Sequence, residues 1–191
     1  MKKLVLLATV AGSAMLFSFR PAPASVWNVD KAHSKLGFTI THMMISDVEG
    51  SFKNFDAKIT ASNDDFTDAV IEVTADVSTI STDNEKRDAH IKTPDFLDAT
   101  KFSTLTFKST SFEKSGKNYK IKGNLTMHGV SKPVELDAVI RMGKNMKGEP
   151  VAGMKITGKL NRKNFEVGSS APEAMLSEQI SIIANGEFSK N

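Results

Sequence analysis

Apolar and polar residues alternate along most of the chain with a period of two, which is typical of β-strands that bury one face. The clearest case runs from Lys117 to Arg141, where the alternation continues on both sides of a turn at His128-Gly129. Two such runs joined by a two-residue turn predict an antiparallel hairpin with one apolar face. A hairpin of this kind is not stable alone in water, so further strands must cover that face.

The same alternation predicts strands before and after this hairpin. They are expected over residues 34–42, 48–61, 69–78, 104–112, 150–163 and 179–188, with 26–30 as a short lead-in. Trp27, the only tryptophan, is expected to anchor the lead-in against the body of the protein. The phase of the alternation slips between Phe52 and Phe55, which predicts a β-bulge near Lys53-Asn54.

One long segment, residues 81–100, breaks the alternation because it is rich in charged residues and helix formers. It predicts a helical turn from about Asn84 to Ile91 and a second short one after Pro94. Residues 168–176 predict a loop or a single helical turn. Long ordered segments of this kind often contact ligands.

Eight consecutive strands with short connections favour an up-and-down meander that closes into a barrel, because closure removes exposed strand edges. We therefore predict an all-β fold, an eight-stranded antiparallel barrel with a short inserted helical segment. The inward positions mix glycine and alanine with phenylalanine and methionine. This mixture favours a hollow interior, although a filled interior in which small residues interdigitate with large ones fits the same pattern.

The beginning of the chain has the features of a secretory signal. Lys2 and Lys3 precede an apolar run over residues 4–19, and Ala22-Pro23-Ala24 offers the small residues that signal peptidase reads. The run is shorter than the roughly 20 residues that a membrane-spanning helix needs. We predict a cleaved signal peptide over residues 1–24, a periplasmic or secreted protein, and no stable membrane insertion.

Loss of the signal peptide changes the charge of the remaining domain, residues 25–191. The whole chain of 191 residues has a formal net charge of +3, and the signal peptide contains Lys2, Lys3 and Arg20 but no acidic residue. The domain is therefore formally neutral, which gives no support to nucleic-acid binding. The chain has no cysteine, so disulfides, thiolate nucleophiles and zinc-thiolate sites are excluded.

The motifs give little support to catalysis or to a cofactor. None of the four histidines, His33, His42, His90 and His128, forms an H-x-H or H-x-x-x-H pair, so we expect no metal site. There is no G-x-S-x-G motif and no phosphate-binding glycine loop, and we assign no catalytic residue and no cofactor. Two alternatives stay open: a lipid-modifying or hydrolytic enzyme with His42 or His90 as general base, and an empty module that acts through its surface.

Four basic side chains are candidates for the polar end of a ligand site: His42, Arg87, His90 and Arg162. His42 and Arg162 end otherwise apolar strand faces, where a basic group is costly unless a polar or anionic group meets it. Arg87 and His90 lie three residues apart on the expected helix and can point the same way. The alternative is structural pairing of Arg87 with Asp88 or Asp95, and of Arg162 with Glu166.

Six blocks of sequence point to one family. They are W-N-V-D-K-A-H-S-K-L-G-F-T-I-T-H at 27–42, V-E-G-S-F at 48–52, R-D-A-H-I-K-T-P-D-F-L-D-A at 87–99, T-L-T-F-K-S-T at 104–110, G-N-L-T-M-H-G-V-S-K-P-V-E-L at 123–136 and N-R-K-N-F at 161–165. In this order they resemble the YceI-like family of bacterial exported polyisoprenoid-binding proteins. The resemblance implies a lipocalin-like barrel whose pore binds a long isoprenoid chain with its polar end near the mouth, and often a homodimer.

Together these features predict non-enzymatic binding, storage or transport of an isoprenoid-type lipid, such as a polyprenyl phosphate or a quinone. The residues expected to contact the tail are Phe38, Ile40, Phe52, Ile71, Val73, Phe107, Gly123, Leu125, Met127, Leu136, Met154, Ile156 and Gly158. His42, Arg87, His90 and Arg162 are expected near the head group.

Overall fold

The computed structural model describes residues 23–63 and 65–190, so all of the expected signal peptide except Pro23 and Ala24 lies outside the described residues. In chain order the elements are β1 (Ser25–His42), β2 (Ser46–Phe52), β3 (Phe55–Ala61), β4 (Val70–Asp76), η1 (Val77–Thr79), β5 (Ile80–Ser81), α1 (Glu85–Ile91), β6 (Thr104–Ser115), β7 (Asn118–Met127), β8 (Val130–Lys144), β9 (Pro150–Asn161), η2 (Arg162–Phe165) and β10 (Leu176–Lys190). Within the described part of the chain, no helix is both long enough and apolar enough to cross a membrane.

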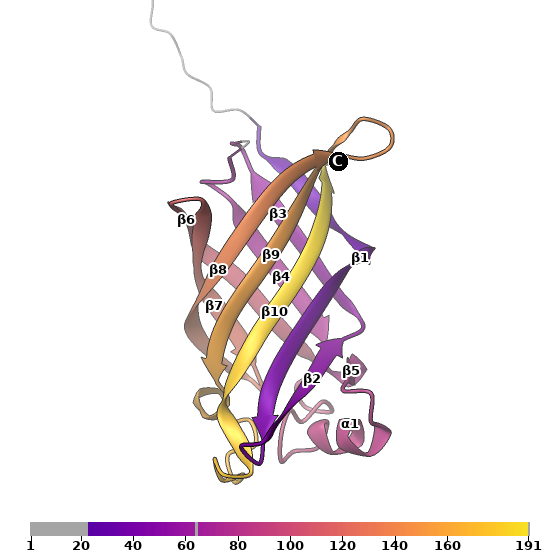
Figure 1. The fold of residues 1–191 in the computed structure, drawn as a ribbon, viewed down its shortest axis with the longest axis vertical. Helices are drawn as coiled ribbons and strands as arrows, with labels where there is room; N and C mark the ends of the chain where they lie inside the picture. Colours follow the sequence, from indigo (N-terminus) through magenta and orange to yellow (C-terminus); the bar gives the residue numbers. More distant parts are fainter. Residues whose placement is uncertain (1–22, 64, 191) are drawn as a thin grey trace, which may run out of the picture.

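The strands form one antiparallel sheet that closes on itself (Figure 1). From β6 to β10 each strand pairs with the next along the chain, and β10 pairs back to β1. β2 and β3 pair with opposite ends of β1, β5 pairs with β2, and β4 pairs with β3. β2 and β3 are therefore two parts of one bent strand of the barrel, and β4 and β5 are two parts of another. Counted this way, the barrel has eight strands, which confirms the predicted fold class.

The break between β2 and β3 falls where the phase slip predicted a bulge. The Lys53 N–H donates to the carbonyl oxygen of Thr79 at 3.1 Å, and the Asn54 N–H donates to the Thr79 hydroxyl at 3.0 Å. A short helical turn thus takes the place of a partner strand at the bend. Phe52 before it and Ala57 after it are both buried, so the bend keeps the apolar face of the strand inside.

The expected lead-in and first strand form a single element, β1, so their separation in the prediction is wrong. Asp30 pairs with Glu187 on β10, whereas Lys35 pairs with Asn185, so residues 31–34 of β1 lie opposite a single residue of β10. These four residues form a bulge that interrupts the alternation, because they have no one-to-one partners on β10. Trp27 lies before the bulge and is 3% exposed, as expected for an anchor.

The turn that joins β7 to β8 has the backbone conformation that its sequence indicates. His128 and Gly129 have φ values of 52° and 73°, so both central residues are in the left-handed region. That combination defines a type I′ turn, whose twist matches the twist of the two strands it connects.

The inserted segment covers the lower end of the barrel in Figure 1. Its helix α1 matches the prediction, and the Asn84 side chain caps it by accepting the Arg87 N–H at 3.0 Å. The second short helical turn expected after Pro94 is only a single hydrogen-bonded turn, in which the Phe96 N–H donates to the carbonyl oxygen of Thr93 at 3.0 Å, because the next amides donate to carbonyls more than four residues earlier. The Leu97 N–H, for example, donates to the carbonyl oxygen of Ile91 at 3.0 Å.

The interior of the barrel is filled at one end and hollow at the other. The buried side chains of the filled half do not line the large cavity, and they include Ile59, Ile71, Ile121, Ala138, Ala152 and Met154. Tilted ring pairs, Trp27 with Phe66 and Phe112 with Tyr119, pack at the same end. The sequence was compatible with a hollow or a filled interior, and the barrel has both, in different halves.

Candidate ligand-binding cavity

The lower half of the barrel encloses an apolar cavity of about 610 Å³. This volume lies within the range of roughly 300–1,000 Å³ that is usual for small-molecule sites. Nine of the residues expected to contact a tail line it: Phe38, Ile40, Phe52, Val73, Phe107, Leu125, Met127, Leu136 and Ile156. The period of two brings these side chains together, because it points alternate residues of neighbouring strands to the same interior.

Four residues expected to contact a tail, Ile71, Gly123, Met154 and Gly158, are not among the residues that line the cavity. Ile71 and Met154 point inward but belong to the filled half. A side chain at Gly123 would collide with the ring of Phe107, and one at Gly158 would collide with Leu136. These two glycines make room for neighbouring side chains and leave no space for a ligand.

Other residues that line the cavity were missed in the sequence. Ile180, Ile182 and Ala184 face the cavity from β10, and their alternation over residues 179–188 was a sufficient signal. Phe96 and Leu97 come from the inserted segment, where no periodic pattern indicates which side chains turn inward.

Arg87 lies at the cavity and is held there by one neighbouring residue. Its Nε donates to the Thr82 hydroxyl at 2.7 Å, and its Nη2 donates to the Thr82 carbonyl at 2.8 Å. Thr82 is 5% exposed, and its own hydroxyl donates to the Asp88 carboxylate at 2.5 Å. Within residues 23–63 and 65–190, Arg87 forms neither of the alternative ion pairs, and its Nη1 makes no hydrogen bond to the protein. Positioned in this way, the guanidinium can donate to a ligand.

The two histidines expected near a head group also line the cavity, and both are exposed. His42 ends β1, where it pairs with Ser46 and Leu176. The ring of His90 packs edge-on against Phe96, with 5.0 Å between centroids. The structure thus brings His42, Arg87 and His90 to one cavity, where the apolar lining meets solvent.

Arg162 also lines the cavity, but its predicted role as a donor to a head group is not supported by its hydrogen bonds. It is 1% exposed, and its guanidinium donates to the carbonyl oxygens of five residues: Val167, Gly168, Ala171, Leu176 and Ser177. All five N–H directions of an arginine are therefore in use. Burial lowers the pKa of Arg162, although the guanidinium stays charged. Strand phase correctly placed Arg162 inward, but the chain after η2 turns back so that the carbonyls of residues 167–177 surround its guanidinium.

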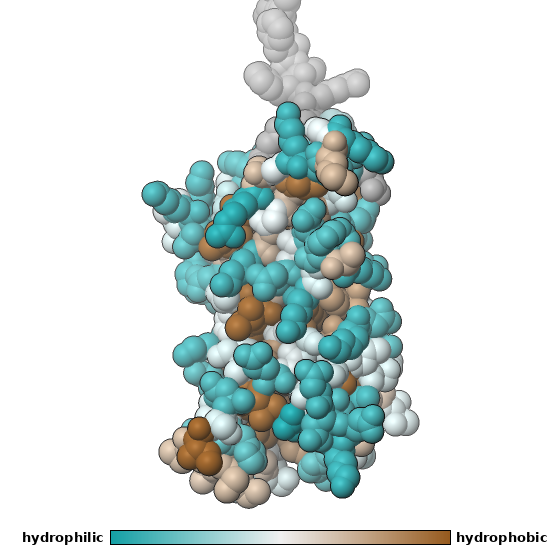
Figure 2. Space-filling view, turned by 45° about the vertical axis from the view of Figure 1, so that its right-hand side comes forward, coloured by the Kyte–Doolittle hydropathy of each residue, from teal (hydrophilic) through white to brown (hydrophobic). Residues whose placement is uncertain are grey.

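Apolar side chains are exposed beside the opening of the cavity. Met43, Met44 and Ile45, at the tip between β1 and β2, are 53%, 76% and 83% exposed. The Met43 N–H donates to the carbonyl oxygen of Met175, which lies just before β10 and is itself exposed. Figure 2 shows brown and tan side chains at the lower end of the molecule, where Figure 1 places this tip.

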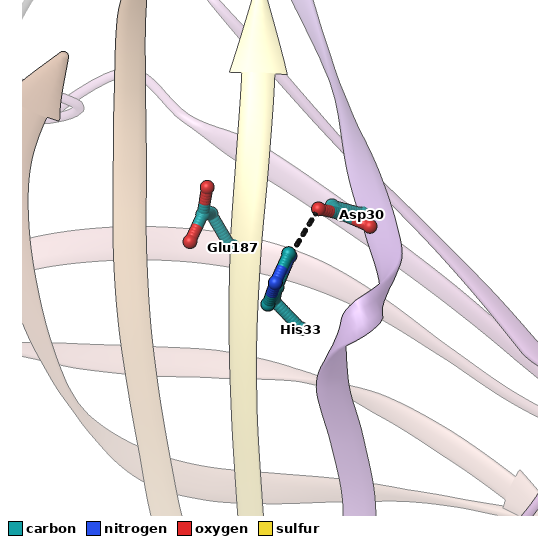
Figure 3. Close-up of side chains that lie close together, drawn as sticks. All are labelled: Asp30, His33 and Glu187. Atoms are coloured by element: carbon teal, nitrogen blue, oxygen red, sulfur yellow. Dashed lines mark hydrogen bonds and ion pairs between the residues drawn. The ribbon is translucent and has the colours of Figure 1, made fainter. Parts of the chain in front are cut away.

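A separate polar cluster lies on the outside of the barrel at the β1 bulge. Figure 3 shows His33 directed toward Asp30, with Glu187 of β10 close by. The Nδ1 of His33 lies 2.6 Å from a carboxylate oxygen of Asp30. This hydrogen bond raises the pKa of His33 and lowers that of Asp30. The three side chains offer possible metal-ligand atoms within 4.8 Å of one another. The ion pair between His33 and Asp30 is enough to explain why they lie together.

The family profile described as "YceI-like domain" matches residues 27–188. The chain belongs to the YceI-like family. Among YceI-like relatives, Protein YceI of Shigella flexneri is 34% identical over 190 residues, which cover 98% of this chain and 97% of the relative. The crystal structure of the YceI protein of Campylobacter jejuni has a TM-score of 0.71 and 34% identity, covering 85% of this chain and 95% of that one.

A more distant structural match is described as a polyisoprenoid binding domain from Saccharophagus degradans. It has a TM-score of 0.62 and covers 86% of this chain and 98% of that one, at 12% sequence identity. At that identity the likeness shows a shared fold alone.

Proposed function

We propose that this YceI-like protein binds an isoprenoid-type lipid, such as a polyprenyl phosphate or a quinone, and stores or carries it in the periplasm without altering it. The observation that carries the proposal is an apolar cavity of about 610 Å³ whose basic side chains, His42, Arg87 and His90, lie where it meets solvent. An amphiphile with a long apolar tail and a polar head matches that division. The description of the Saccharophagus degradans domain supports the isoprenoid class, and the predicted signal peptide supports export.

The energetics favour such a ligand. Burial of one methylene group contributes about 0.8 kcal/mol, so each five-carbon isoprene unit would contribute roughly 3–4 kcal/mol. Arg87 would add charge-assisted hydrogen bonds to a phosphate through the donors that Thr82 leaves free. The apolar tail would therefore supply most of the affinity, and the head group would fix its orientation.

The enzymatic alternative has no comparable support. An activated general base is commonly oriented by a further group, but within the described residues His42 forms no ion pair, and the carboxylate oxygen paired with His90, on Asp95, is 3.8 Å from its Nε2. That distance is longer than a hydrogen bond. We therefore favour binding over catalysis.

Native mass spectrometry of the protein purified from its own host tests the proposal. Ala184→Phe places a ring in the cavity, whereas Ile183→Phe, one residue earlier on β10, places the same ring on the outer face, where Ile183 is 40% exposed. We expect the wild type and Ile183→Phe to carry a lipid of isoprenoid mass, and Ala184→Phe to lose most of it while its circular dichroism stays unchanged. Equal loading of all three proteins, or an empty wild type, would refute the proposal. Conversion of the lipid during incubation would indicate an enzyme.

A further inference from the structure

A second recess lies on the outer wall of the barrel, where β1 bulges and the strand formed by β2 and β3 bends. It has a volume of about 300 Å³ and is lined by Phe52 and Phe55 together with five polar residues, Lys31, Ser34, Lys35, Ser51 and Lys53. None of its lining residues is acidic.

The recess exists because β1 loses its partner for several residues. Pairing of β1 with β3 ends at Asn28 opposite Lys58, and pairing with β2 begins at Leu36 opposite Phe52. Residues 29–35 and 53–57 face each other across this gap without forming a ladder. The Lys53 and Asn54 amides, which a ladder would otherwise use, donate to Thr79 instead.

The positive charge of the recess is not neutralised by nearby side chains. Lys31, Lys35 and Lys53 form no ion pair within 4 Å in the described part of the chain. Asp30, the carboxylate next to Lys31, is occupied by His33 and by the Ala32 N–H at 2.9 Å. Asp30 and His33 form a cluster with Glu187 of β10 (Figure 3), and none of these three residues lines the recess.

The polar groups of the recess have unused hydrogen-bonding capacity. Ser51 is 5% exposed as a residue, but its hydroxyl is not among the buried polar atoms that lack a hydrogen-bond partner in the described residues, so solvent or a ligand in the recess can reach it. The Ser34 oxygen accepts the Glu187 N–H at 3.0 Å, so the hydrogen of its hydroxyl remains available to donate. A ligand that accepts several hydrogen bonds would satisfy both serines.

We propose that this recess binds a phosphate-type oxyanion. Three lysines supply compact positive charges, which suit a multivalent anion approached from several directions. The hydroxyls of Ser34 and Ser51 supply further donors, and phosphate oxygens accept hydrogen bonds from both kinds of group. Apart from Phe52, which lines both, the recess shares no lining residue with the lipid cavity. The phosphate can belong to a soluble molecule or to the head group of an anionic phospholipid.

Titration of the isotope-labelled mature protein with inorganic phosphate, followed by NMR, tests the site directly. We expect saturable shifts of the amides of residues 31–35 and 51–55. The triple variant Lys31→Gln/Lys35→Gln/Lys53→Gln should bind phosphate at least about tenfold more weakly, and Ser51→Ala about threefold more weakly. The matched control, Lys117→Gln/Lys144→Gln/Lys147→Gln, removes the same charge from exposed positions elsewhere and should stay within about twofold of wild type.

A second arm distinguishes the two sources of phosphate. Wild-type protein is sedimented with phosphatidylcholine vesicles that contain or lack phosphatidic acid. Retention only by vesicles with phosphatidic acid, lost in the recess triple variant but kept in the control triple variant, would identify a head group. Phosphate shifts without such retention would identify a soluble ligand.

Three results would overturn the proposal: no binding in either arm, equal weakening in both triple variants, or phosphate shifts confined to residues 84–95 at the cavity. The lipid content of the recess triple variant, measured by native mass spectrometry, should equal that of wild type. Failure of this site is therefore distinguishable from failure of the proposed lipid-binding function.

Discussion

Arg162→Gln should destabilise the fold, because the guanidinium of Arg162 holds the loop between β9 and β10 together through backbone carbonyls. Two of the five acceptors, the carbonyl oxygens of Val167 and Gly168, form buried hydrogen bonds to it, while water can reach the other three. A buried acceptor without a donor costs about 1–3 kcal/mol, so the two together predict a loss of about 4 kcal/mol. That loss is a large fraction of the roughly 5–15 kcal/mol that stabilises a typical domain.

Thermal and urea unfolding measure this effect. For a domain of this size, 4 kcal/mol corresponds to a fall in Tm of about 8–16 °C. Hydrogen exchange of the amides of residues 166–177 should accelerate more than exchange in β7 and β8. Arg141→Gln is the matched control, because Arg141 is exposed on β8, and its Tm should change by less than about 2 °C.

The reasoning would be refuted if Arg162→Gln left the Tm and the exchange of this loop unchanged while it weakened lipid binding. That outcome would make Arg162 a ligand for the head group, as the sequence alone suggested. Arg162→Lys separates charge from geometry, since it keeps the positive charge but offers three donors in place of five. We expect it to recover less than half of the lost stability.

Three further predictions follow from other features. Arg87→Gln should weaken binding of a polyprenyl phosphate by about tenfold, or about 1.4 kcal/mol, with little change in Tm. Isothermal titration of this variant with the lipid checks the prediction, with Lys86→Gln, its exposed neighbour on α1, as the control. A fall in Tm with unchanged affinity would contradict it. Gly129→Ala should destabilise more than Gly148→Ala by urea unfolding, because both glycines have positive φ but only at Gly129 would the added carbon meet a neighbouring ring; equal losses would contradict the contact. Because its carboxylate partner raises the pKa of His33, the folded protein binds this proton more tightly than the unfolded chain, so the stabilisation is present below the unfolded value of about 6.5 and is lost as pH rises through the folded pKa. The Tm difference between wild type and His33→Gln should therefore shrink between pH 5.5 and 8, and a difference that does not change with pH would show that the pair does not titrate in this way.

Strand phase was sufficient to predict the barrel and much of the cavity wall. Phe38 and Ile40 face the interior because a strand has only two sides, and the hairpin around His128-Gly129 has the turn that its sequence specifies. Phase does not report the height of a residue along the barrel axis. Ile71 and Phe107 both point inward, yet one fills the closed end and the other lines the cavity.

The loops account for most of the errors. The five carbonyl acceptors of Arg162 lie 5 to 15 residues after it in segments without periodicity, so no local pattern indicates them. The turns after Pro94 depend on hydrogen bonds to carbonyls of α1 and of the residues just after it, which a propensity for helix does not reveal. Gly123 has the right phase, but the neighbour that occupies its space is set by packing between strands.

The filled half of the barrel closes the inner end of the cavity, and this limits the length of the tail that the cavity can hold. Above Phe107 and Leu125, the space is closed by side chains such as Ile71 and Ile121, each no more than 1% exposed. A tail that enters at the rim gains contacts with each added isoprene unit until its end reaches this layer. Longer tails must leave their remaining units outside, where they gain nothing. Affinity across a series of prenyl chains should therefore rise steeply and then level off, and the length at which it levels off measures the depth of the cavity.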